Sequence, residues 1–146
     1  MSAPAIDICT PDEAWKSLEA DPSAALIDVR TRAEWSFVGI PDIGPLGRET
    51  VLIEWAQFPT MAPNPAFAEA VLSAVEPKDG GQLFFICRSG ARSRDAAHLV
   101  KASCAEQGVE VRCVNVDEGF EGDLNTHSHR GVLNGWKARG LPWRQS

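Results

Sequence analysis

The sequence predicts an α/β fold: a small, mostly parallel five-stranded sheet with helices on both faces. Strand-like and helical patterns alternate along the 146 residues, as they do in chains that form parallel sheets. The runs at residues 24–29 and 83–86 are almost wholly apolar, which is typical of strands buried on both faces. The length fits a single domain covering residues 1–146 that can bury a core.

Each expected strand is a short apolar or alternating run bounded by turn residues. These strands cover residues 5–9, 24–29, 51–53, 83–86 and 109–116. The expected helices carry apolar residues at helical spacing or begin at a capping residue. They cover residues 11–20, 31–37, 66–75, 93–106 and a short stretch near 132–137. The Gly/Pro-rich passage at 39–47 is expected to be a loop.

The first helix has the clearest start signal. Thr10 is a typical N-cap residue, Pro11 suits the first helical position, and Glu13 follows the cap by three residues. Thr31 is expected to cap the second, shorter helix. These signals place two helix starts directly after predicted strands.

The charge balance and the hydropathy pattern limit the kinds of partner. The formal net charge is -6, which argues against nucleic acid because binding to a phosphate backbone depends on Lys and Arg. No stretch approaches the roughly 20 apolar residues that span a bilayer. The N-terminal residues lack the basic flank and apolar run of a secretory signal. We therefore expect a cytoplasmic protein without a nucleic-acid or membrane partner.

The cysteines are expected to be free thiols rather than disulfides or zinc ligands, since their spacings lack CxxC pairs. They are Cys9, Cys87, Cys104 and Cys113. All except Cys87 are interpreted as small buried residues, the usual environment of a free cysteine. His127 and His129 form a His-x-His pair, but no acidic or cysteine cluster is placed to complete a metal site. We expect both to be polar loop residues and predict no metal.

Cys87 differs from the other thiols because it follows the most apolar predicted strand and precedes a loop and a helix. Loop amides and the first amides of a helix can converge on one point and attract an anion. The positive end of the helix dipole and nearby arginines would then favour a thiolate, the nucleophilic form of cysteine. The sequence therefore predicts Cys87 as the nucleophile. The expected binding loop consists of Arg88, Ser89, Gly90, Ala91, Arg92 and Ser93.

Residues 87–92 read CRSGAR, which resembles the active-site loop of rhodanese-like sulfurtransferases. Residues 26–30, with Glu34-Trp35 and 39–41, resemble an early strand motif of that family. Residues 135–136, with 140–143, resemble its closing segment. The chain departs from the family at one point: relatives often have a His between the residues that match Gly39 and Ile40. We expect this difference to affect the local loop shape rather than the reaction.

The resemblance implies a ping-pong sulfurtransferase. A small anionic sulfur donor such as thiosulfate would leave its outer sulfur on Cys87 as a persulfide, and a thiol or a protein acceptor would then take it. The loop amides would cradle that sulfur, and Arg88 and Arg92 would steer the donor. Asp28 and Arg30 would be a supporting structural ion pair, and no metal or organic cofactor is implied.

Two other functions compete with this interpretation. A phosphatase of similar fold would need five residues between the cysteine and its arginine, whereas Arg92 leaves four and Arg94 six. A non-enzymatic binding or regulatory module is the second alternative, and the retained cysteine and complete loop argue against it. Trp35 and Phe37 are candidates for the mouth of the pocket. His98 is interpreted as a residue on the helix surface.

Overall fold

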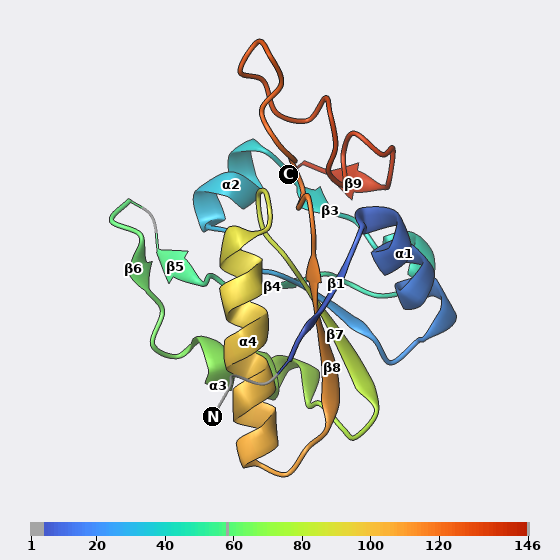
Figure 1. Ribbon diagram of the computed structural model, residues 1–146, viewed down its shortest axis with the longest axis vertical. Helices are drawn as coiled ribbons and strands as arrows, with labels where there is room; N and C mark the ends of the chain where they lie inside the picture. The colour runs from blue at the N-terminus through green and yellow to red at the C-terminus, as the bar shows by residue number, and fades with distance from the viewer. Residues whose placement is uncertain (1–4, 58, 146) are drawn as a thin grey trace.

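The computed structural model describes residues 5–57 and 59–145 and is built on a five-stranded, wholly parallel sheet (Figure 1). Along the sheet the strand order is β1-β8-β7-β2-β4. The strands are β1 (Asp7–Cys9), β2 (Ala25–Asp28), β4 (Val51–Leu52), β7 (Gly81–Ile86) and β8 (Val111–Val116). The predicted fold class is confirmed. Central strand β7 carries the candidate nucleophile at its carboxyl end.

Helices cover both faces of the sheet (Figure 1). They are α1 (Pro11–Ala20), α2 (Arg32–Phe37), α3 (Phe67–Val75), α4 (Ala91–Glu106) and a short 3-10 turn, η1 (Gly44–Leu46). Two hydrophobic cores result, one beneath α3 and α4 and the other beneath α1. Both expected caps are present: Thr10 with Glu13, and Thr31 with Glu34, form capping boxes at the starts of α1 and α2.

Side chains of β7 alternate between the two cores. Leu83 and Phe85 lie in the core beneath α3 and α4, whereas Phe84 and Ile86 lie in the core beneath α1. Cys87 continues this alternation on the α4 side, because successive side chains of a strand point to opposite faces. The period of the strand therefore turns the thiol toward the start of α4.

The C-terminal segment differs from the prediction. No helix forms near 132–137; this stretch consists of turns and bends, because Gly131, Gly135 and Gly140 adopt positive φ values that interrupt a helix. Instead, β9 (Trp143–Arg144) pairs antiparallel with β3 (Ile40–Pro41), within the passage expected to be a loop. The two partners lie far apart in the sequence, so local patterns carry no signal for their pairing.

Two further differences are local. β5 (Ala56–Gln57) and β6 (Ala62–Pro63) form a small antiparallel ribbon that was not predicted, because each strand is too short to show a period. α4 begins at Ala91 rather than near Ser93, directly after Gly90 in a left-handed conformation with φ of 117°.

None of the helices in the described residues combines the length and the apolar character that crossing a bilayer requires.

Phe85 should contribute strongly to stability because its side chain is 0% exposed within the core beneath α3 and α4. Phe85→Ala is expected to lower the free energy of unfolding by about 3–5 kcal/mol. Phe37 is 82% exposed and provides the matched control. Phe37→Ala should change that free energy by less than about 0.5 kcal/mol. Urea denaturation followed by circular dichroism measures both, and equal effects would contradict the described core.

Candidate active site

Cys87 lies immediately after β7, and two hydrogen bonds point at its sulfur. Its Sγ accepts from the Gly90 backbone N–H at 3.1 Å and from the Ser93 hydroxyl at 3.2 Å. The side chain is only 1% exposed. The predicted strand, loop and helix thus bring Cys87, Gly90 and Ser93 together. Of the loop amides expected around the sulfur, Gly90 is the one within hydrogen-bond distance of Sγ in the described residues.

The loop is held in place by the segment after β8. The carbonyl of Cys87 accepts from Phe120 N–H at 2.8 Å, and that of Arg88 accepts from Glu121 and Gly122 N–H at 3.0 and 3.2 Å. A Cβ at Gly119 would lie 2.5 Å from both carbonyl oxygens, so only glycine permits this approach. These bonds engage the carbonyls of Cys87 and Arg88 with the segment after β8 and not with the thiol.

The start of α4 supplies a favourable field for an anion at Cys87. Gly90 is its N-cap residue and makes no side-chain cap, and the first amides of a helix have no acceptor within the helix itself. The 16-residue length of α4 aligns many peptide dipoles, whose positive end meets the loop. This arrangement suits a thiolate or a persulfide anion.

The other thiols have a different environment. All four cysteines are free, as predicted. Burial raises the pKa of the Cys9 and Cys113 thiols to about 12, and burial also raises the pKa of Cys104. These three side chains lie in the two hydrophobic cores, which agrees with their interpretation as packing residues.

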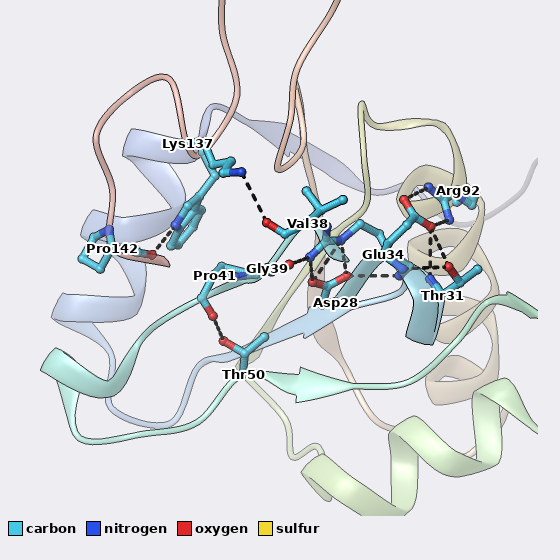
Figure 2. Close-up of polar contacts among 12 residues, drawn as sticks. Asp28, Thr31, Glu34, Val38, Gly39, Pro41, Thr50, Arg92, Lys137 and Pro142 are labelled. Carbon is cyan, nitrogen blue, oxygen red and sulfur yellow. Dashed lines mark hydrogen bonds and ion pairs between the residues drawn. The ribbon is translucent and has the colours of Figure 1, made fainter. Parts of the chain in front are cut away.

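Arg92 is engaged in an ion pair that the sequence did not predict. Its two terminal nitrogens donate to the two carboxylate oxygens of Glu34 at 2.7 and 2.9 Å (Figure 2). Burial opposes ionisation of Glu34, but the hydrogen bonds and charge of Arg92 outweigh it and lower the pKa of Glu34 to about 2. The donor-steering role of Arg92 therefore stays a prediction, and Glu34 offsets much of the charge on which that role depends.

A large groove opens beside the loop. Its volume is about 1080 Å³, and Arg88 and Arg92 contribute to its wall, whereas Cys87 does not. Among the described residues no side-chain partner is found for Arg88, which is exposed. Of the two residues expected at the mouth, Phe37 lines the groove and Trp35 does not. His129 lines it too, while His98 and His127 are absent from the described wall.

Several segments contribute side chains to the groove wall, and some of them contribute both polar and apolar ones. The apolar side chains lie on α2, beside β6 and after β8: Ala33, Phe37, Val38, Pro59, Met61 and Leu124. Arg130 is the third arginine of the wall, and its guanidinium donates to the Gly122 carbonyl at 2.6 Å. The wall therefore combines exposed apolar surface with positive charge, although the whole chain is acidic.

Asp28 and Arg30 form the scaffold pair that was expected. Both are 0% exposed, and Arg30 Nη2 donates to Asp28 Oδ2 at 2.7 Å. The same nitrogen donates to the carbonyl of Gly39 at 2.7 Å, and Gly39 lies beside Asp28 in Figure 2. The guanidinium also lies 4.4 Å from the ring centre of Phe120. Arg30 thereby connects the end of β2 with the segments on either side of the site.

The sequence did not identify two residues of the site, Glu34 and Asn115. Glu34 was noted only as a helix residue and motif member, and its contact with Arg92 spans 58 positions. Asn115 is 5% exposed and lies between Ser93 and Gly90. Its signal in the sequence was a polar residue on the face of the last sheet strand that otherwise carries Val111 and Cys113.

The Glu34–Arg92 pair should make stability depend on acidic pH. A carboxylate with a lowered pKa stabilises the fold above its unfolded pKa, here 4.5, and this contribution disappears as pH falls through about 2. Glu34→Gln keeps the capping side chain but removes the charge, so it should cost on the order of 2 kcal/mol at pH 7. The difference in the free energy of unfolding between the wild type and Glu34→Gln should vanish near pH 2, where Glu34 of the folded protein becomes protonated.

Urea unfolding at several pH values measures this difference. Glu19→Gln is the control, because Glu19 is an exposed residue of α1 and the variant makes the same change in net charge. A cost for Glu34→Gln that stayed constant down to the lowest pH would contradict the ion-pair interpretation.

Comparison with known proteins agrees with this architecture. The Rhodanese-like domain family matches residues 10–125. An uncharacterized protein of Rickettsia conorii is 34% identical over 138 residues, covering 94% of this chain and 96% of the relative. An uncharacterized protein of Rickettsia prowazekii is also 34% identical over 138 residues, with the same coverage.

Solved structures give the same result. The crystal structure of Rv0390 from M. tuberculosis has a TM-score of 0.82 and 42% identity, covering 98% of this chain and all of that one. A polysulfide-sulfur transferase homodimer from Wolinella succinogenes has a TM-score of 0.55 at 19% identity, covering 97% of this chain and 80% of that one, and shares the fold. From its sequence match and its architecture, the chain belongs to the rhodanese-like family.

Proposed function

We propose that this protein is a sulfurtransferase that carries sulfane sulfur as a persulfide on Cys87. The observation that supports this most is the position of its Sγ, which accepts two hydrogen bonds at the positive end of α4. Such a position stabilises a negatively charged sulfur without a metal. Membership of the rhodanese-like family supports the same chemistry.

The first half-reaction loads the enzyme. The Cys87 thiolate attacks the outer sulfur of thiosulfate, a new S–S bond forms, and the old S–S bond breaks. Sulfite leaves with the electron pair of the broken bond, and the outer sulfur remains as the persulfide anion. The amides at the start of α4 and the Ser93 hydroxyl would offset charge on the two sulfur atoms during this exchange.

The second half-reaction returns the thiolate. A nucleophile, such as cyanide or the thiolate of an acceptor, attacks the outer sulfur and forms a bond to it. The bond to Cys87 breaks, and its electrons remain on Sγ. The cycle transfers one sulfur atom with no net oxidation, so it needs no organic cofactor. The partners would thus be a small anionic sulfur donor and a thiol or protein acceptor.

The groove beside the loop supports an acceptor larger than an inorganic anion. Its volume of about 1080 Å³ exceeds what a four- or five-atom anion would fill, and it lies slightly above the usual upper size of small-molecule sites, about 1,000 Å³. Arg88, exposed at its wall, is placed to attract a negative group toward the loop. Since Glu34 neutralises Arg92, Arg88 would do most of this steering.

The burial of Cys87 favours a second candidate, a non-enzymatic binding module. A thiol that is 1% exposed presents little surface to a donor. In that case the groove would bind a ligand while Cys87 served as a core residue. The two candidates differ in one product, the persulfide on Cys87.

Mass spectrometry of the intact protein after incubation with thiosulfate tests the proposal. The mass should rise by one sulfur atom, peptide mapping should place it on Cys87, and cyanide should remove it. Cys87→Ser should abolish the added mass and the sulfur transfer while leaving the circular dichroism spectrum unchanged. Cys9→Ala, which removes a thiol from an edge strand, is the control and should retain both. A wild-type protein that gains no sulfur would support the binding module instead.

The steering role of Arg88 has its own test. Arg88→Ala should raise the KM for thiosulfate about fivefold to twentyfold, because one favourable charge contact is lost, with kcat changed by less than about twofold. The effect should shrink at high ionic strength. Arg94→Ala is the matched control, since Arg94 lies on the first turns of α4 but lines a different cavity. Equal KM changes in the two variants would rule out a specific role for Arg88.

A further inference from the structure

Asn115 is a polar side chain at a position where the alternation of β8 calls for an apolar one. Val111 and Cys113 on the same face belong to the core beneath α3 and α4, and Asn115 pairs in register with Phe85 of β7. It is only 5% exposed. Burying an amide there is costly unless its polar groups are hydrogen-bonded, so both ends of the Asn115 amide need partners.

Both ends of the Asn115 amide contact the Cys87 loop. Nδ2 donates to the Gly90 carbonyl at 3.1 Å, and Oδ1 lies 2.6 Å from the Ser93 hydroxyl oxygen. Gly90 and Ser93 are the two residues that donate to Cys87 Sγ. Asn115 therefore touches each donor of the sulfur, although the part of the chain that the structure describes gives it no bond to the sulfur itself.

The Ser93 hydroxyl has one proton and several acceptors within reach. Its oxygen is 3.2 Å from Sγ, 3.2 Å from the Gly90 carbonyl and 2.6 Å from Asn115 Oδ1. Because Nδ2 bonds the Gly90 carbonyl, the amide orientation turns Oδ1 toward Ser93. When Sγ is a thiol, S–H donates to Ser93 and Ser93 donates to Asn115. When Sγ is a thiolate, the same O–H rotates to the sulfur.

We propose that Asn115 is a positioning residue for Cys87, holding the Ser93 hydroxyl and the Gly90 turn so that both donors follow the charge on Sγ. The proposal deepens the sulfur-transfer function and rests on it only where persulfide is concerned. In the thiolate, O–H and N–H both face the sulfur. In the persulfide, the charge moves to the outer sulfur, and the hydroxyl proton can return to Oδ1. No proton leaves the site during this rotation.

Other charged groups near the loop would be unchanged by substitution of Asn115. Arg92 interacts electrostatically with Cys87 and is itself paired with Glu34. Asp117 and Arg94 line a small cavity that Gly90 and Asn115 also line. Comparison of variants with the wild type therefore isolates the amide, because these charges are common to all of them.

The first test follows the rate of Cys87 alkylation by iodoacetamide against pH, located by peptide mapping. Asn115→Leu keeps the approximate shape but removes both hydrogen bonds. The rate near neutral pH should fall about tenfold to a hundredfold, and the profile should move to higher pH, because hydrogen bonds to a charged group are lost or misdirected. The loss in thiosulfate turnover should appear in kcat rather than KM. Val114→Ala, on the same strand but facing α1, should leave the profile unchanged.

Asn115→Asp should restore wild-type alkylation of Cys87 at low pH only. A protonated Asp can donate to the Gly90 carbonyl and accept from Ser93. The ratio of the Cys87 alkylation rate in this variant to that in the wild type should therefore approach one at low pH. An ionised Asp loses the donor and adds a negative charge, so the ratio should fall as pH rises. A ratio that did not vary with pH would overturn the proposal.

Ser93→Ala keeps the test valid if the Asn115 variants unfold, because it removes only one hydroxyl. It should shift the alkylation profile in the same direction, and Asn115→Leu should add little in the Ser93→Ala background. An unshifted profile for Ser93→Ala, or fully additive effects, would overturn the proposal. Alkylation does not depend on sulfur transfer. A wild type that formed no persulfide would therefore defeat the proposed function while leaving the role of Asn115 to be decided by these profiles.

Discussion

The candidate site depends on the hydrogen bonds between the Cys87 loop and the segment that follows β8. Phe120 N–H holds the carbonyl of Cys87, and two further amides hold the carbonyl of Arg88. The tail supports that segment in turn, since Trp136 and Lys137 N–H donate to the Gly119 and Phe120 carbonyls at 2.8 and 3.2 Å. A loop that turns its carbonyls toward this support can keep amide hydrogens near the sulfur. The irregular C-terminal residues are therefore part of the architecture of the site.

Carboxylates neutralise some of the arginines near Cys87 and leave others unpaired among the described residues. The chain is acidic overall, yet the region around Cys87 combines a helix N-terminus with several arginines. Arg30 is paired with Asp28 beneath the site and Arg92 with Glu34 beside it. Arg88 is left exposed at the groove. In the proposed sulfur transfer, this distribution would favour one anionic sulfur at Cys87. It would leave Arg88 and Arg130, which have no carboxylate partner among the described residues, to attract the donor.

Buried polar groups orient the residues that donate hydrogen bonds to Cys87. A buried amide or hydroxyl must find partners, and those at Asn115 and Ser93 find them in each other and in the loop. The ring of amides expected from the loop sequence is represented at Sγ by Gly90 alone within the described residues, with the Ser93 hydroxyl as the second donor.

The sequence by itself determined the sheet, the four long or capped helices and the position of Cys87, because these follow from local patterns. Apolar runs, capping boxes and a strand of period two need only neighbouring residues to be recognised. The β3–β9 ribbon, the contact of Glu34 with Arg92 and the contact of Asn115 with Ser93 were decided by tertiary structure. Each joins segments that lie far apart in the sequence, such as Glu34 and Arg92, which are separated by 58 positions. Residue type shows that a group can ionise or donate, but only the folded chain determines which group it meets.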